Sequence, residues 1–230
     1  MDAFLLLLRW LHLLCAFAWL GLLYYFNLVQ APFLAEADAG LRLGVLQKLL
    51  PRALWWFRWA AVGTVAAGLA YLVIWWRSLS WSFTSWTVAI LTGGGMGLLM
   101  FANVWLVLGP AQRVVIASAA TVAAGGKPDP AAAAAARRSA VVSRTNLSFS
   151  IPLLFFMGSA SHYSLFADQP AVRRLVVWAA LSVAAVAALE LNSLCGEGGA
   201  IEQPFASNGR AAAVGVILWF VLLVVIKGVL

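Results

Sequence analysis

Residues 3–29 read AFLLLLRWLHLLCAFAWLGLLYYFNLV, a stretch in which Arg9 is the only charged residue. An α-helix rises about 1.5 Å per residue, so about 20 consecutive apolar residues cross the hydrocarbon core of a bilayer. The stretch is long enough to span a membrane. A secretory signal peptide has basic residues before its apolar core, whereas Asp2 precedes this one and Arg9 and His12 lie inside it. The sequence therefore predicts a retained membrane helix.

The rest of the chain repeats this apolar pattern, with 64% hydrophobic and 10% charged residues overall. Long apolar runs without alternation predict membrane helices rather than the strands of a barrel. The expected spans are residues 3–29, 51–76, 83–108, 141–165, 171–195 and 209–229. The predicted fold is all-α, an integral membrane bundle of about six transmembrane helices that forms a single domain over residues 1–230.

Two connections between these spans have patterns of their own. Residues 36–50 carry leucines and a valine at helical spacing among polar residues and end before Pro51, which predicts a short helix in the membrane interface. Residues 110–140 combine a Gly, Pro and Asp turn with an alanine-rich run. Because alanine favours helix, we expect the third and fourth membrane helices to project into the cytoplasm around a mobile turn.

The basic residues predict the orientation of the chain. With six spans, both termini share one side of the membrane, and five of the 15 Lys and Arg residues fall on that side. These five are Arg9, Arg77, Arg173, Arg174 and Lys227. The side richer in Lys and Arg stays in the cytoplasm, so both termini are expected to be periplasmic, in a bacterial inner (plasma) membrane. The basic residues are scattered over membrane-flanking regions rather than gathered on one soluble face, which argues against a nucleic-acid partner and leaves membrane lipid as the expected one.

Cysteines and glycines exclude several kinds of site. Cys15 and Cys195 are isolated, and the chain has no CxxCH motif, so covalently attached haem c is not expected. Gly93 and Gly97 have the GxxxG spacing that lets a second helix approach closely. A flat macrocycle could use the same space, but close helix packing is the favoured interpretation.

His12 and His162 are the only histidines, and each falls in an apolar segment. An imidazole in such surroundings needs a partner. In the predicted topology both rings belong to the outer half of the bilayer, so one b-type haem could be held between helices one and four, with both histidines as ligands of the haem iron. The alternative is that each ring only forms a hydrogen bond to a neighbouring helix.

Arg9 and Trp19 are the other candidate cofactor-binding residues. Arg9, His12 and Trp19 lie along one stripe of the first helix because their spacing follows the helical repeat. Arg9 would pair with a haem propionate, or anchor the helix at the lipid headgroups. Trp19 would form a cofactor wall or belong to the aromatic residues of the membrane interface.

Several runs resemble a known family. They are RWLH at 9–12, WLGLLYYFN at 19–27, PRALWWFRW at 51–59, NVW at 103–105, GPAQ at 109–112, SRTN at 143–146 and FFMGSASH at 155–162. Together they are similar to the membrane domain of bacterial membrane-bound urate hydroxylases, also called urate oxidases. That domain is normally followed by a c-type cytochrome domain, which is expected to be missing here because no haem-attachment motif precedes Leu230. The early histidine followed by Trp and Gly is also similar to J-type protoporphyrinogen oxidases.

The resemblance implies a function for the predicted haem. We expect a membrane redox protein that passes electrons through haem b toward a periplasmic c-type cytochrome or a larger respiratory complex, with urate as a candidate reductant and the catalytic residues unassigned. The alternative is a noncatalytic structural or accessory subunit of a membrane electron-transfer complex. A transporter should show interrupted half-helices and a charged midplane site, and the sequence favours it least.

Overall fold

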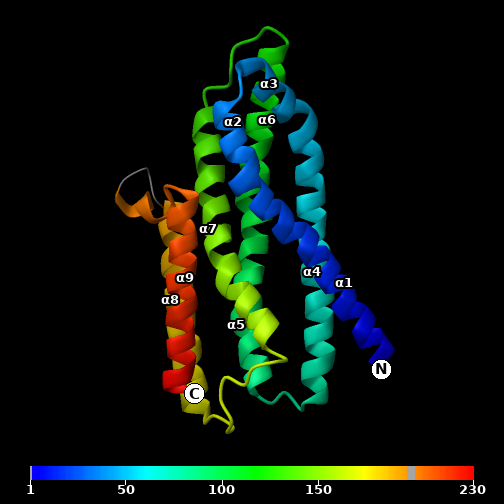
Figure 1. Ribbon diagram of the computed structural model, residues 1–230, viewed down its shortest axis with the longest axis vertical. Coiled ribbons are helices and arrows are strands. Elements are labelled where there is room, and N and C mark those ends of the chain that lie inside the picture. The colour runs from blue at the N-terminus through cyan, green and yellow to red at the C-terminus, as the bar shows by residue number, and fades with distance from the viewer. Residues whose placement is uncertain (1, 196–199) are drawn as a thin grey trace. The chain divides into compact units, whose positions relative to one another are not determined.

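The computed structural model describes residues 2–195 and 200–230, and within these ranges it contains helices, turns and bends but no strand (Figure 1). Among the described residues, six helices are long and apolar enough to cross a membrane. They are Ala3–Glu36, Ala39–Ser78, Ser85–Ala123, Ala132–Ser159, Val172–Cys195 and Asn208–Val229. The prediction of an all-α, multi-pass membrane protein with six spanning helices is therefore confirmed.

The first two spanning helices are compound. The first consists of α1 (Asp2–Tyr24), the π-helical η1 (Tyr25–Gln30) and α2 (Ala31–Glu36), and the second of α3 (Ala39–Gly44), the π-helical η2 (Val45–Leu49) and α4 (Leu50–Ser78). Between them Ala37 is extended, and the Asp38 carboxylate caps α3 by accepting the Leu41 N–H at 2.9 Å. A short interfacial helix was predicted for residues 36–50. In the structure these residues contain the break at Ala37 and Asp38, followed by the first turns of the second spanning helix.

The third and fourth spanning helices extend well into the connection between them. The third consists of α5 (Ser85–Asn103), the π-helical η3 (Val104–Leu108) and α6 (Gly109–Ala123), and the fourth is α7 (Ala132–Ser159). Most of residues 110–140, predicted as a cytoplasmic loop, are therefore helical, as the preference of alanine for helix favours. Ser118 in α6 accepts the Asp129 N–H at 3.0 Å and so ties the short connection to the helix.

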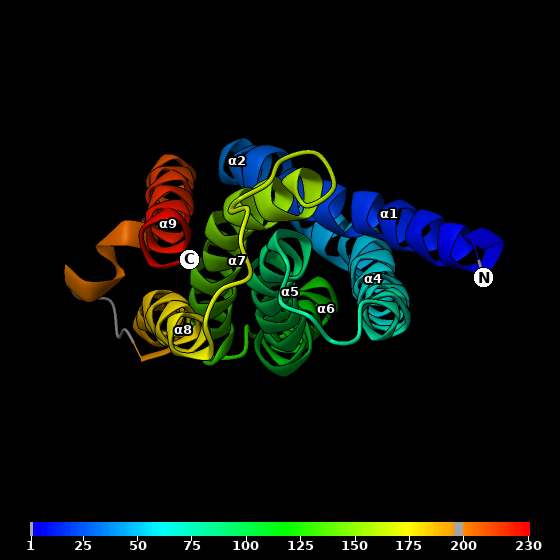
Figure 2. The ribbon, with the colours of Figure 1, turned by 90° about the horizontal axis from the view of Figure 1, so that it is seen from below.

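The last two spanning helices are α8 (Val172–Cys195) and α9 (Asn208–Val229), with a short 3₁₀ helix, η4 (Ala200–Phe205), before α9. α8 and α9 lie side by side in both views (Figures 1 and 2). Arg144 of α7 donates from Nη1 to the carbonyl oxygens of Phe205 and Ala206, both at 3.1 Å. A charged residue within a spanning helix thus holds the segment that enters α9.

The chain folds into two compact units. Unit 1 comprises Met1–Tyr71 and Phe101–Ser143, and unit 2 comprises Leu72–Met100 and Arg144–Leu230. The π-helical segments η1, η2 and η3 all belong to unit 1. A π-helical segment inserts an extra residue into a helical turn, which turns the side chains that follow it, and such segments occur often at functional sites.

Unit 2 is packed through glycines. A Cβ atom on Gly93 of α5 would lie 3.3 Å from the Leu153 carbonyl oxygen of α7, so the two helices are in close contact. A Cβ atom on Gly215 of α9 would lie only 2.5 Å from the Ser148 carbonyl oxygen. Pro152 has no N–H to donate to the Ser148 carbonyl oxygen, so α7 lacks one backbone hydrogen bond at the point where α9 approaches. The prediction that the glycines of α5 serve close helix packing is confirmed.

Candidate functional site

His12 lies in unit 1, where α1 crosses α4 (Figure 1). Its Nδ1 atom is 2.8 Å from the carbonyl oxygen of Thr64 on α4. A carbonyl oxygen only accepts hydrogen bonds, so Nδ1 carries the proton and donates it. In a neutral imidazole this bond selects the tautomer with the lone pair on Nε2.

Because Gly68 has no side chain, it leaves room for the His12 imidazole against α4. It lies one helical turn after Thr64, and a Cβ atom there would be 2.7 Å from His12 Nδ1 and 2.8 Å from His12 Cε1. Those distances are too short for a real contact, so any side chain at this position would displace the ring. Glycine therefore uncovers the Thr64 carbonyl and lets the histidine of α1 reach it.

The next turn of α1 repeats the arrangement. A Cβ atom on Gly63 would lie 2.6 Å from the Sγ atom of Cys15. Cys15 follows His12 by three residues and therefore lies on the same face of α1. Two small residues on α4 thus set the spacing between the helices and hold the imidazole in one orientation.

The other candidate residues of α1 differ in exposure. Arg9 is exposed, whereas the side chain of Trp19 is only 2% exposed. The indole Nε1 atom of Trp19 is buried and has no hydrogen-bond partner among the residues that the structure describes. Along the predicted stripe, burial therefore increases from Arg9 through the half-buried His12 to Trp19.

His162 belongs to unit 2 and follows α7 rather than lying in it. The fourth spanning helix ends at Ser159, not at residue 165, because the chain turns there: the backbone N–H groups of His162 and Tyr163 both donate to the Ser159 carbonyl oxygen. The side chain of His162 is exposed, and its Nδ1 atom lies 3.1 Å from the Gly158 carbonyl oxygen. The expected position of His162 inside the apolar helix was therefore wrong by about one turn.

The two histidines nevertheless share one chemical feature. In each, Nδ1 donates to a backbone carbonyl oxygen, so Nε2 is left to accept a hydrogen bond or to bind a metal. Metal-ligating histidines characteristically donate their second ring N–H in this way, which fixes the ring and raises the basicity of the ligand. Both residues therefore leave Nε2 free of this contact, each within its own unit.

Side chains that commonly bind metal ions do not cluster in the described part of the chain. In the described ranges, no group of three or more His, Cys, Asp and Glu residues is placed to hold a metal ion. Cys15 and Cys195 are free thiols, in α1 and at the end of α8.

Reading the sequence alone missed the α4 side of the His12 site. Thr64 and Gly68 have the small-xxx-small spacing that marks close helix contacts in membranes, and this signal could have identified the face of α4 that α1 meets. Arg58 and Trp105 were also missed as a pair, although the Arg58 Cζ atom lies 4.5 Å from the centre of the Trp105 ring.

Comparison with known proteins adds one family match. Residues 74–221 match the family model described as urate oxidase N-terminal. The matched region contains His162 and most of unit 2, whereas His12 precedes it. No curated protein and no solved structure matches the chain significantly.

Proposed function

Because the chain belongs to the urate oxidase N-terminal family, we propose that it is a membrane redox protein that accepts electrons from urate and passes them on through a buried b-type haem. The family description supports urate as the reductant. The six spanning helices support a site within the membrane. The observation that carries the proposal is the His12 Nδ1 to Thr64 hydrogen bond, which leaves the Nε2 atom of His12 available as a ligand.

In this proposal the Nε2 atoms of His12 and His162 would hold the haem iron. A bound haem b would supply one-electron exchange between the reductant and the next carrier. Thr64 and Gly68 hold the His12 ring so that its Nδ1–H points to α4, and the Gly158 carbonyl oxygen does the same for His162. Arg9, one turn before His12, would donate to a haem propionate, and Trp19 would line the cofactor.

The direction of electron flow rests on the charge distribution of the loops. The excess of Lys and Arg on the side opposite the termini supports periplasmic termini in a bacterial inner membrane. A periplasmic c-type cytochrome or a larger membrane complex would then be the electron acceptor.

A noncatalytic structural or accessory subunit is the second candidate. The bond from His12 to the Thr64 carbonyl oxygen joins α1 to α4, and this is also what an imidazole with a purely packing role would do. The two candidates differ in one prediction: only the redox protein binds haem through Nε2.

A reduced-minus-oxidised absorption spectrum of the purified full chain separates them. We expect a b-type signal in the wild type and its loss or displacement in both His12→Ala and His162→Ala, because each would remove one proposed ligand of the iron. Cys15→Ala is the matched control, since Cys15 lies on the same face of α1 and contacts α4 without being a proposed ligand. A wild type without haem absorbance, or histidine variants with an unchanged spectrum, would contradict the proposal.

Adding urate to the oxidised protein without oxygen tests the reductant. We expect urate to produce the reduced spectrum and added cytochrome c to reoxidise it. If dithionite reduces the haem but urate does not, the protein is still an electron carrier, but urate is not its reductant.

A further inference from the structure

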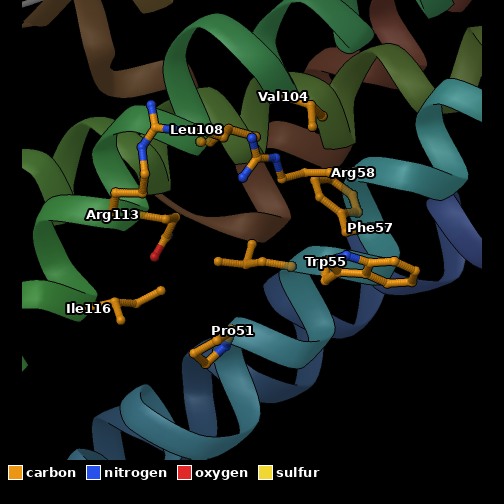
Figure 3. Close-up of a pocket in the computed structure, with 11 residues that line it drawn as sticks. Pro51, Trp55, Phe57, Arg58, Val104, Leu108, Arg113 and Ile116 are labelled. Carbon is orange, nitrogen blue, oxygen red and sulfur yellow. The ribbon is translucent and has the colours of Figure 1, made fainter. Parts of the chain in front are cut away.

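Unit 1 contains a cavity of about 220 Å³ between α4 and the helix formed by η3 and α6. Its walls include Leu54, Trp55, Arg58, Val104, Leu108 and Arg113. Figure 3 shows Arg58 reaching from α4 toward the helix that carries Val104 and Leu108. The cavity thus combines apolar walls with two guanidinium groups and is separate from the His12 contact.

Arg58 is the less exposed of the two arginines that line this cavity, since Arg113 is exposed. Arg58 lies within the second spanning helix, and none of the residues that line the cavity is Asp or Glu. Its Nε atom is buried and has no hydrogen-bond partner in the described part of the chain. A charged group within a membrane segment is costly unless it is paired, so an anion is the missing partner.

Trp105 fixes the direction of the Arg58 side chain. The Arg58 Cζ atom lies 4.5 Å from the centre of the Trp105 ring, a cation–π contact that holds the guanidinium while its N–H groups stay available. Trp105 is in η3, so the π-helical segment that supplies Val104 and Leu108 to the cavity also supplies this support. The Trp105 Nε1 atom is a second buried donor without a partner among the described residues.

We infer that this cavity binds an oxyanion of the phosphate type, held by Arg58 and Arg113 and supplied by the headgroup of an anionic phospholipid. The planar guanidinium donates two parallel hydrogen bonds to such a group. The amide nitrogen of Gln112 donates to Ser139 Oγ at 2.6 Å. Arg58 and Arg113 are the charged donors among the residues that line the cavity. Basic pockets between membrane helices bind acidic headgroups in this way, and the apolar walls suit the rest of the lipid.

Native mass spectrometry of the full chain measures lipid binding directly. The protein is released from phosphatidylcholine nanodiscs with and without phosphatidylglycerol, and we expect preferential retention of phosphatidylglycerol. Arg58→Gln and Arg113→Gln should each lower its affinity about tenfold or more, since each removes a charged donor. Arg52→Gln is the matched control: it removes the same charge from an exposed position on α4 outside the cavity, and should change the affinity less than about twofold.

Titration with inorganic phosphate, followed by calorimetry in detergent, distinguishes the source of the oxyanion. If the wild type binds phosphate, Arg58→Gln abolishes this binding, and no lipid is preferred, the oxyanion site is supported and its ligand is water-soluble. If Arg58→Gln does not fold, Arg58→Lys keeps the charge but loses the planar fork, and a severalfold loss is expected. Binding of neither probe, or equal losses in the Arg52 and cavity variants, would overturn the inference.

Discussion

The first and fourth spanning helices differ in how they use their neighbours. We compare the most apolar 18-residue stretch of each helix. In the first spanning helix 17% of these residues are buried, and in the fourth, α7, 61% are buried. Both meet glycines on adjacent helices. Against α1, glycines make room for the side chains of His12 and Cys15, and against α7 they make room for the backbone at Ser148 and Leu153.

Glycines at helix contacts therefore have two different roles in this protein. Where a glycine faces the backbone of the neighbouring helix, the contact is rigid, because a backbone cannot move without moving the helix. Where it faces a side chain, the neighbour can rotate away, but the orientation of that side chain is lost. Substitutions in unit 2 should therefore reduce stability, and substitutions beside His12 should mainly alter the site.

Gly215→Ala should have the largest effect on stability. The new Cβ atom would lie 2.5 Å from the Ser148 carbonyl oxygen and 2.8 Å from Ile151 Cδ1, so α9 must move away from α7. Overpacking of this kind costs about 3 kcal/mol of unfolding free energy. Unfolding by sodium dodecyl sulfate in mixed micelles measures it, with Gly209→Ala as the control because that position is open. Equal stability of the two variants would contradict the packing described for unit 2.

Gly68→Ala should have a moderate effect on stability and a clear effect on the site. Its Cβ atom would displace the His12 ring and break the bond to the Thr64 carbonyl oxygen, which costs about 1 kcal/mol. We expect the b-type signal to decrease or shift, because the ring is no longer held in one orientation. Gly21→Ala, where no atom lies within 4 Å of the new Cβ atom, should leave the spectrum unchanged. A Gly68 variant with a wild-type spectrum would show that the α4 contact does not position a ligand.

Gly93→Ala should have the smallest loss. Its Cβ atom would lie 3.3 Å from the Leu153 carbonyl oxygen and from two side-chain atoms, so shifts of a few tenths of an ångström accommodate it. We expect a loss of less than about 1 kcal/mol in the same unfolding experiment. At Gly95, two residues further along α5, no atom is near, and alanine should be neutral or stabilising there because it favours helix. If both variants behave alike, α7 does not pack on this face of α5.

The sequence predicted the spanning helices better than their ends. Apolar length identifies a membrane segment, but it does not show how far a helix extends beyond the membrane. Helix therefore continues through the alanine-rich residues before residue 141, and α7 stops at Ser159 because the turn at His162 offers its N–H groups to the Ser159 carbonyl oxygen. The π-helical segments were not predicted either, since an inserted residue leaves no mark on average hydropathy.

The candidate site was only half predictable for a similar reason. The sequence shows two histidines in apolar segments, and an imidazole in such surroundings needs a partner. His12 meets the Thr64 carbonyl oxygen beside Gly68. The spacing of Thr64 and Gly68 marks a close contact face on α4, but it does not say which helix meets that face. The pairing of Arg58 with Trp105 likewise depends on the rotation of α4 relative to η3.

The sequence by itself determined that this chain is a bundle of membrane-spanning helices, because a bilayer accepts long apolar runs only when their backbone hydrogen bonds close within each helix. It also determined which few polar residues need an explanation. The tertiary structure decided which backbone atom each imidazole meets, which glycines face side chains and which face a backbone, and which arginine borders a cavity without a carboxylate. These depend on the rotation and crossing of helices, which packing between side chains fixes.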